Sequence, residues 1–363
     1  MTQPPETTAA RATTSERLRR HGAKLAVSLV LAAAFGWTLH RGGLRIVPPR
    51  DALARVSLPA CAGYVALMLA MQWFRAARWR HLLAPIATVP LRRIVAVSFI
   101  GFTAILLLPL RAGELVRPYL IRDKGKLSLA AATGTIGAER VIDGLFLTLL
   151  LGVCLQIARP LSPLPDHIGK LPISVAAVPL YAYTALAAFV VAFVLMGLFY
   201  WRPALGHRLA AATLGPFSTS LAARAEDFVK KIADGLHFLP SPRHFGPFLF
   251  ETALYWGLNA VGMWVLAHGC GIASMTLVQA CVVMGVLGVG ILVPAGPGLF
   301  GAFQWSIFAA LAMYFPDDVV LGPGEAFVFL VYAIQFVWHL ASAGYCLATE
   351  RGAAHAVVEA ELG

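Results

Sequence analysis

Long apolar runs separated by short polar segments cover most of the chain. A helix that crosses a bilayer needs about 20 apolar residues, so most runs predict one crossing each. The run 276–315 is long enough for two crossings or a hairpin. The pattern predicts an all-α, polytopic membrane protein with about six full spans and two broken or re-entrant helical hairpins. The apolar runs are 25–39, 56–74, 94–110, 141–158, 171–201, 245–267, 276–315 and 326–349.

Two of these runs break on proline and glycine, in LLLPLRAGELVR around Pro109 and in ILVPAGPGLFGAF around Pro294. Because a bilayer offers no water to backbone polar groups, an interrupted helix is stable there only where neighbours pack it or where it lines a cavity. Transporters place such breaks where they handle their substrate. The residues predicted to form the breaks are Pro109, Gly113, Pro294, Gly296, Pro297, Gly298 and Gly301.

The two breaks recur at an offset of 185 residues, which relates Pro109 to Pro294, each with a glycine four residues later. This match alone is weak, because a chain with 23 prolines and 33 glycines in 363 residues contains roughly two such pairs by chance. At the same offset, however, a span, a break and a span recur over about 56–158 and 241–349. The pattern favours an inverted repeat over the alternative that any chain with many spans partly matches itself.

Composition supports a membrane protein, and charge suggests its orientation. The chain is 59% hydrophobic and 13% charged, with a mean hydropathy of +0.74, which exceeds what a soluble domain can bury. Its net charge of +11 comes from short basic clusters beside apolar runs, where they signal topology and contact anionic lipid rather than nucleic acid. If 94–120 enters and returns on one side, the basic loops 75–93, 111–126 and 202–243 are all cytoplasmic, as are both termini. The arginines of 41–55 then lie outside, against the positive-inside tendency.

The polar pattern divides the chain into a disordered cytoplasmic arm, 1–22, a single membrane domain, 23–350, and a cytoplasmic tail, 351–363. The basic residues before the first apolar run also fit a cleaved signal peptide. A retained span is favoured, because the rest of the chain is embedded in the membrane. Between the two repeat units, residues 218–238 place apolar side chains on one helical face, which predicts a helix lying in the membrane interface.

Charged residues gather after the first break and at the start of the next span. Ionisable groups at membrane depth are costly and are usually paired or face a wet cavity. Glu139 and Asp143 are four residues apart and so share a helix face. Three arginines and three carboxylates nearly neutralise one another, as a static salt-bridge network or as arginines that exchange a carboxylate for a lipid phosphate. The six residues are Arg111, Glu114, Arg117, Glu139, Arg140 and Asp143.

Other chemistry is sparse. The second break contains G-x-G-x-x-G, but no strand precedes it, so its glycines predict a sharp turn rather than a dinucleotide site. The last span carries a polar stripe. Hydrogen bonding between helices is its favoured role, and the alternative is that the stripe lines a path for a lipid head group. No metal-ligand spacing, activated nucleophile or nucleotide motif is found, so no cofactor, metal or enzymatic activity is predicted. The stripe is Tyr332, Gln335, His339, Ser342 and Cys346.

Four segments together resemble the flippase-like family named for the transmembrane region of lysylphosphatidylglycerol synthase. They are RAARWRHLL, PLRAGELVRPYLIR, GAERVIDGL and PAGPGLFGAFQWSIFAAL, and the resemblance covers about residues 60–345. It implies an all-helical protein of a bacterial-type cytoplasmic (inner) membrane, with broken helices that face each other and a role in moving lipids between leaflets. Relatives often carry Glu where this chain has Gln304, which argues against carboxylate-based ion coupling at the second break. Nothing polar and globular follows Glu350, so lipid aminoacylation is not expected.

These observations favour a lipid flippase or transporter that moves a lipid with a polar or anionic head group. The alternatives are a membrane-embedded transferase acting on a lipid-linked substrate, and a non-catalytic scaffold for a complex with a lipid-synthesis enzyme. The candidate substrate-binding residues are Arg75, Arg78, Arg111, Glu114, Arg117, Glu139, Arg140, Asp143, Gln304, Gln335 and His339.

Overall fold

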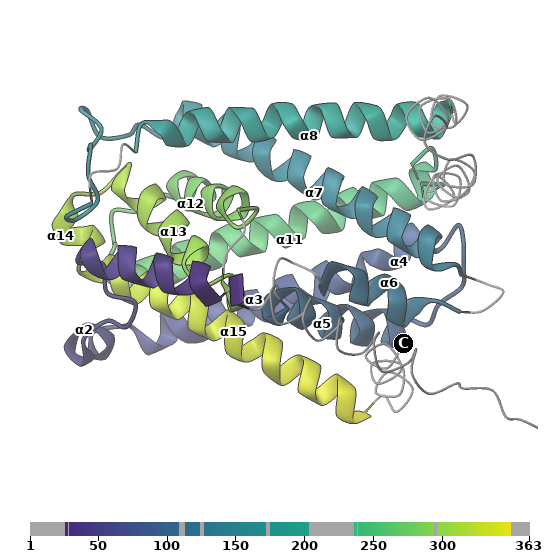
Figure 1. Cartoon of the computed structure of the whole chain (residues 1–363), viewed down its shortest axis with the longest axis horizontal. Coiled ribbons are helices and arrows are strands. Elements are labelled where there is room, and N and C mark those ends of the chain that lie inside the picture. The colour runs from purple at the N-terminus through teal and green to yellow at the C-terminus, as the bar shows by residue number, and fades with distance from the viewer. Residues whose placement is uncertain are drawn as a thin grey trace, which may run out of the picture.

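The computed structural model describes residues 26–27, 29–108, 113–123, 127–171, 175–202, 236–237, 239–293 and 296–349, and every regular element in them is a helix (Figure 1). Within these ranges, three helices are long and apolar enough to cross a membrane, over Leu129–Ile157, Ala177–Leu198 and Asp317–Thr349. The helical membrane class is therefore confirmed. The number of about six spans stays a prediction.

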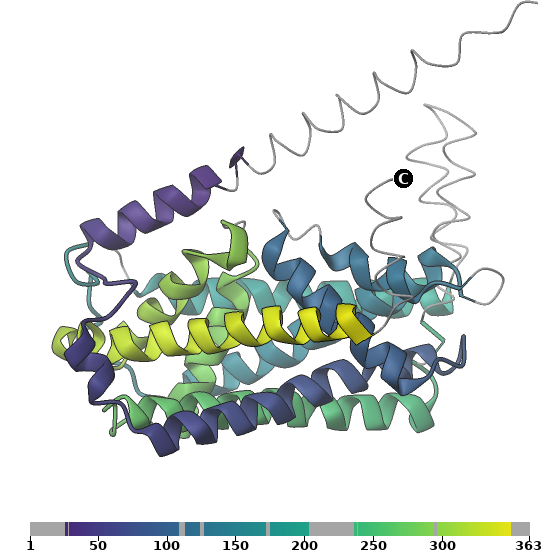
Figure 2. The same ribbon diagram turned by 90° about the horizontal axis from the view of Figure 1, so that it is seen from below.

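Two long helices, α3 (Leu58–Ala77) and α11 (Pro242–Gly269), pack along their lengths in opposite directions. The start of α3 contacts the end of α11, where Gly269 leaves no room for a side chain beside Ala60. Past the end of α3, Arg78 reaches the first half of α11, and the short helix α4 (Trp79–Leu83) follows at once. The pair lies side by side along one edge of the bundle in Figure 2.

A helical hairpin surrounds the first break. It consists of α5 (Leu91–Leu107) and α6 (Val116–Ile121). Gly113 lies against the backbone of Ala104, and Arg117 lies against Gly101, one turn earlier in α5. The two arms, α5 and α6, therefore run antiparallel. This is the geometry that the predicted re-entrant segment requires, although residues 109–112, with Pro109 and Arg111, lie outside the described residues.

A second hairpin surrounds the second break. Helix α12 (Leu277–Gly290) leads to the short 3-10 helix η2 (Pro297–Leu299), and α13 (Ala302–Ala312) returns beside α12. Gly298 and Gly301 have φ values of 76° and 92°, a backbone region that glycine adopts without strain. The predicted sharp turn is confirmed at these two positions. Pro294 lies outside the described residues.

The remaining helices enclose the hairpins. Helix α7 (Leu129–Ile157) pairs with α8 (Ala177–Trp201), whose apolar side chains are largely exposed, and α15 (Pro323–Thr349) packs against α5. Two short helices, α2 (Arg50–Ala54) and α14 (Asp317–Val320), lie near the start of α15. The order α3, α5, α6, α7 is followed by α11, α12, α13, α15, as the repeat requires. Its inverted symmetry stays a prediction.

The second break also contacts the first hairpin, because η2 packs against α5. Helix 29–41 packs against the second break, where Ala32 lies against Gly296 and Phe35 lies against Gly301. The predicted interfacial helix, 218–238, lies almost wholly outside the described residues, as do the arm and the tail.

Candidate functional site

Glu139 and Asp143 lie on one face of α7, as predicted, and both carboxylates point toward the same arginine, Arg78. Two nitrogens of Arg78 contact the two oxygens of Asp143, each at 2.6 Å, and Nη2 lies 3.5 Å from Glu139 Oε1. Arg78 also donates to the Thr252 hydroxyl at 2.8 Å. Arg78 is completely buried. Through these contacts, this one side chain links the end of α3 to α7 and to α11.

Arg117 extends the cluster from α6. Its Nη1 lies 3.0 Å from Glu139 Oε1, and its Nη2 donates to the Ser98 hydroxyl at 3.4 Å. The guanidinium stacks over the Trp79 ring at 4.3 Å, an arrangement that stabilises a cation away from water. The Arg117 side chain fits only because α5 has glycine at position 101, where a Cβ would lie 2.1 Å from Arg117 Cγ.

Arg140 lies at the edge of the cluster. It is half-buried and lies 3.8 Å from both Glu114 and Glu139, longer than a hydrogen bond. The count of three arginines against three carboxylates in the sequence omitted Arg78, which is the partner that Asp143 contacts. Arg111, the third arginine of that count, lies outside the described residues.

Arg75 differs from the other described arginines of the cluster, because it has no carboxylate within 4.0 Å in the described part of the chain. Its half-buried guanidinium lies over the Phe102 ring at 3.9 Å and near the Tyr255 ring at 5.8 Å. Its one hydrogen bond among the described residues is to the neutral Gln72 amide oxygen, at 3.5 Å. The described cluster therefore has four arginines and three carboxylates, a net charge of one positive. The arginines are Arg75, Arg78, Arg117 and Arg140, and the carboxylates are Glu114, Glu139 and Asp143.

The polar stripe on α15 is used largely in hydrogen bonds to other helices. His339 Nδ1 lies 2.6 Å from the Gln335 carbonyl, so this nitrogen donates and Nε2 accepts from the Gln72 amide at 3.2 Å. Gln335 donates to the Tyr64 hydroxyl at 3.1 Å. The favoured interpretation of the stripe fits these contacts. His339 nevertheless borders the cluster, because Gln72 contacts both His339 and Arg75.

Gln304 has a local role in the second hairpin. Its Oε1 accepts the Gly301 backbone N–H at 2.8 Å, which satisfies one of the open donors at the start of α13. The side chain is buried. No hydrogen bond or ion pair joins it to the arginine cluster in the described residues. The second break is held by a different contact, from the Tyr332 hydroxyl to the Gly298 carbonyl at 3.0 Å.

Sequence reasoning missed several neutral partners in the cluster. Gln72 stands alone as a polar residue in an apolar run, which is a weak signal. The hydroxyls of Ser98 and Thr252 resemble any others in apolar helices, and Phe102 and Tyr255 resemble ordinary core aromatics. Only packing brings them to the arginines. Among the described residues, no group of three His, Cys, Asp or Glu side chains could hold a metal ion.

The family model described as the lysylphosphatidylglycerol synthase TM region matches residues 23–343. The chain belongs to this family. Membership confirms the resemblance found in the four sequence segments and identifies a membrane protein of lipid metabolism or transport. No curated protein matches the chain, and no solved structure does so either.

Proposed function

We propose that this protein moves a lipid with a polar or anionic head group between the leaflets of a cytoplasmic membrane. The observation that supports this most directly is Arg75, a half-buried arginine with no carboxylate partner among the described residues. An uncompensated charge inside a membrane domain is costly, and such charges usually serve a substrate path. Arginine suits a lipid phosphate, because its planar fork can donate two hydrogen bonds to two oxygens.

Two other arginines of the cluster, Arg78 and Arg117, act as a fixed support. Arg78 and Arg117 are completely buried and contact Asp143 and Glu139 at hydrogen-bond distance. Breaking such pairs in a low-dielectric interior is strongly unfavourable, so these arginines do not release their carboxylates during transport. Their role is to hold α3, α6, α7 and α11 in place around the head-group site.

Arg140 is the arginine suited to exchange partners. It is half-buried, and its carboxylates are 3.8 Å away. A phosphate that approaches Arg75 would offer Arg140 a closer anion than Glu114 does. The two hypotheses left open by the sequence, a static network and a network that exchanges carboxylate for phosphate, thus apply to different arginines of one cluster.

The two hairpins provide the route in this proposal. The second break packs against α5, the helix that carries Phe102 beneath Arg75. A head group bound at Arg75 would pass between the two hairpins, while its acyl chains stay in the bilayer. Re-entrant hairpins that enter from opposite faces would open this site to each face in turn.

Reconstitution tests the proposal. Vesicles containing the purified protein and a fluorescent anionic phospholipid are mixed with a membrane-impermeant quencher, which reports how fast lipid leaves the inner leaflet. We expect the wild type to move the lipid, and Arg75→Gln to slow it about tenfold, as the loss of one charge-assisted hydrogen bond implies. Arg159→Gln, a charge loss at an exposed position, should leave the rate unchanged.

Equal rates for wild type, Arg75→Gln and protein-free vesicles would refute the proposal. A chemically altered lipid in the wild-type vesicles would instead indicate the transferase alternative.

A further inference from the structure

A second basic site lies outside the arginine cluster, at the end of the bundle where α5 and α11 begin. A pocket of about 380 Å³ is formed there by α4, the loop that follows α4, and the first turns of α5 and α11. Its apolar wall comes from Leu83, Ala84, Ala87, Val89 and Ile94. The pocket thus joins an apolar wall to the polar ends of helices.

Four basic side chains from two helices line this pocket. Arg80 and His81 come from α4, and Arg243 and His244 come from the first turn of α11. In the described part of the chain, the carboxylate that contacts this group is Glu251, whose Oε1 is shared by Arg80 and His81. With both histidines neutral, two arginines against one carboxylate leave a net charge of one positive.

Arg243 and His244 make no side-chain hydrogen bond or ion pair in the described part of the chain. They also lie where the partial positive charge of a helix N-terminus makes further cations unfavourable. Basic side chains that converge in such a place are stabilised when an anion binds between them. If Arg243 and His244 only formed part of a solvated basic surface, they would have no reason to line the same pocket as Arg80.

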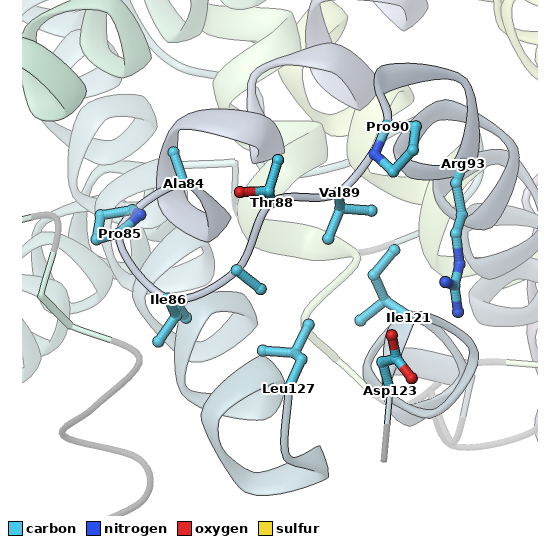
Figure 3. Close-up of a pocket in the computed structure, with 11 residues that line it drawn as sticks. Ala84, Pro85, Ile86, Thr88, Val89, Pro90, Arg93, Ile121, Asp123 and Leu127 are labelled. Atoms are coloured by element: carbon cyan, nitrogen blue, oxygen red, sulfur yellow. The ribbon is translucent and has the colours of Figure 1, made fainter. Parts of the chain in front are cut away.

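The pocket on the other side of the same loop provides a contrast. Figure 3 shows this neighbouring pocket, where Arg93 and Asp123 lie on the same side, beside Ile121. Among the described residues its lining carries one arginine and one aspartate, and Arg93 already donates to the carbonyls of Leu120 and Arg122, at 3.4 and 3.5 Å. An anion is therefore favoured in the pocket of Arg80 and Arg243, and not in its neighbour.

We propose that the pocket lined by Arg80, His81, Arg243 and His244 binds the phosphate of an anionic phospholipid. Basic pockets between membrane helices are typical sites for anionic head groups. The apolar wall favours a lipid over free phosphate, because it can contact the glycerol and the first part of an acyl chain. This site is separate from Arg75 and does not depend on the proposed transport.

Thermal unfolding of the full chain in detergent tests this site. A ligand that binds the folded state raises Tm with its concentration, which yields an apparent affinity. The probes are phosphatidylglycerol, phosphatidylcholine and inorganic phosphate. All variants are also made in the Arg75→Gln background, so that binding at Arg75 does not contribute. Arg243→Gln removes a cation that has no ion-pair partner among the described residues, Arg243→Lys keeps the charge, and Arg202→Gln is a control at another exposed position.

Phosphatidylglycerol should raise Tm more than phosphatidylcholine does. Arg243→Gln should weaken its apparent affinity about fivefold, since one basic residue contributes about 1 kcal/mol to binding an anionic lipid. Arg243→Lys and Arg202→Gln should bind as the parent does. Equal weakening by Arg243→Gln and Arg202→Gln would overturn the site, because net charge alone would then explain the binding. If inorganic phosphate raised Tm as much as phosphatidylglycerol does, the proposal that the bound phosphate belongs to a lipid would be overturned.

Discussion

Arg78 and Asp143 form a bidentate ion pair inside the helix bundle, with both nitrogen–oxygen distances at 2.6 Å. The residues are 65 positions apart, and the arginine has no exposed surface. A pair of this geometry satisfies two donors and two acceptors at once. It fixes the junction of α3 and α4 against α7, and so positions Arg75 one turn earlier in α3.

Removing one partner of this pair should destabilise the protein strongly. We expect Arg78→Gln or Asp143→Asn to lower the free energy of unfolding by about 3–5 kcal/mol, because the remaining charge is buried without compensation. Thermal unfolding in detergent measures the effect. The double variant should lose less than the sum of the two single losses, because its second substitution no longer breaks a pair. Single variants as stable as Arg159→Gln would contradict the pairing.

Glycine at position 101 is required by Arg117. We expect Gly101→Ala to destabilise the protein by about 1–3 kcal/mol, as overpacking does, because the new Cβ would lie 2.1 Å from Arg117 Cγ. Gly137→Ala is the matched control on α7, where a Cβ meets nothing within 4 Å. It should stabilise the helix by about 0.5–1 kcal/mol. The prediction is wrong if the two variants unfold at the same temperature.

Stacking on Phe102 should orient Arg75 for its anion. Arg75→Lys keeps the charge but loses the planar fork, so its lipid transport should fall between that of the wild type and that of Arg75→Gln. Phe102→Leu should slow transport severalfold, because a cation over an aromatic ring gains about 0.5–2 kcal/mol. Phe250→Leu changes an exposed ring on α11 and should transport normally. Arg75→Lys with the full wild-type rate would show that charge alone is sufficient.

The Gln304 side chain should act through the backbone of the second break. Gln304→Ala leaves the buried Gly301 N–H without its acceptor, and the free energy of unfolding should fall by about 1–3 kcal/mol. Gln304→Glu keeps an acceptor at the same place and should lose less. Hydrogen exchange of the Gly301 amide reports the contact directly. Slow exchange in Gln304→Ala, as in the wild type, would rule out this cap.

Hydropathy and local spacing correctly predicted several features. The lengths of the apolar runs indicated helices at membrane scale, and the spacing of Glu139 and Asp143 predicted their common helix face. Glycines 298 and 301 indicated the turn of the second hairpin. These features depend on residues close together in the chain, where helix geometry decides which side chains are neighbours.

Partners depended on the tertiary structure. The sequence counted Arg111, Arg117 and Arg140 against the carboxylates, while packing brought Arg78 to Asp143 and left Arg75 without a carboxylate among the described residues. Gln304 appeared as a candidate contact for substrate, and the fold uses it as a helix cap. Helix periodicity decides which way a side chain faces, but only the packing of one helix against another decides what it meets. For this protein, the sequence alone determined a helical membrane domain with two breaks and a charged segment. The tertiary structure decided which arginine of the cluster has no carboxylate partner among the described residues.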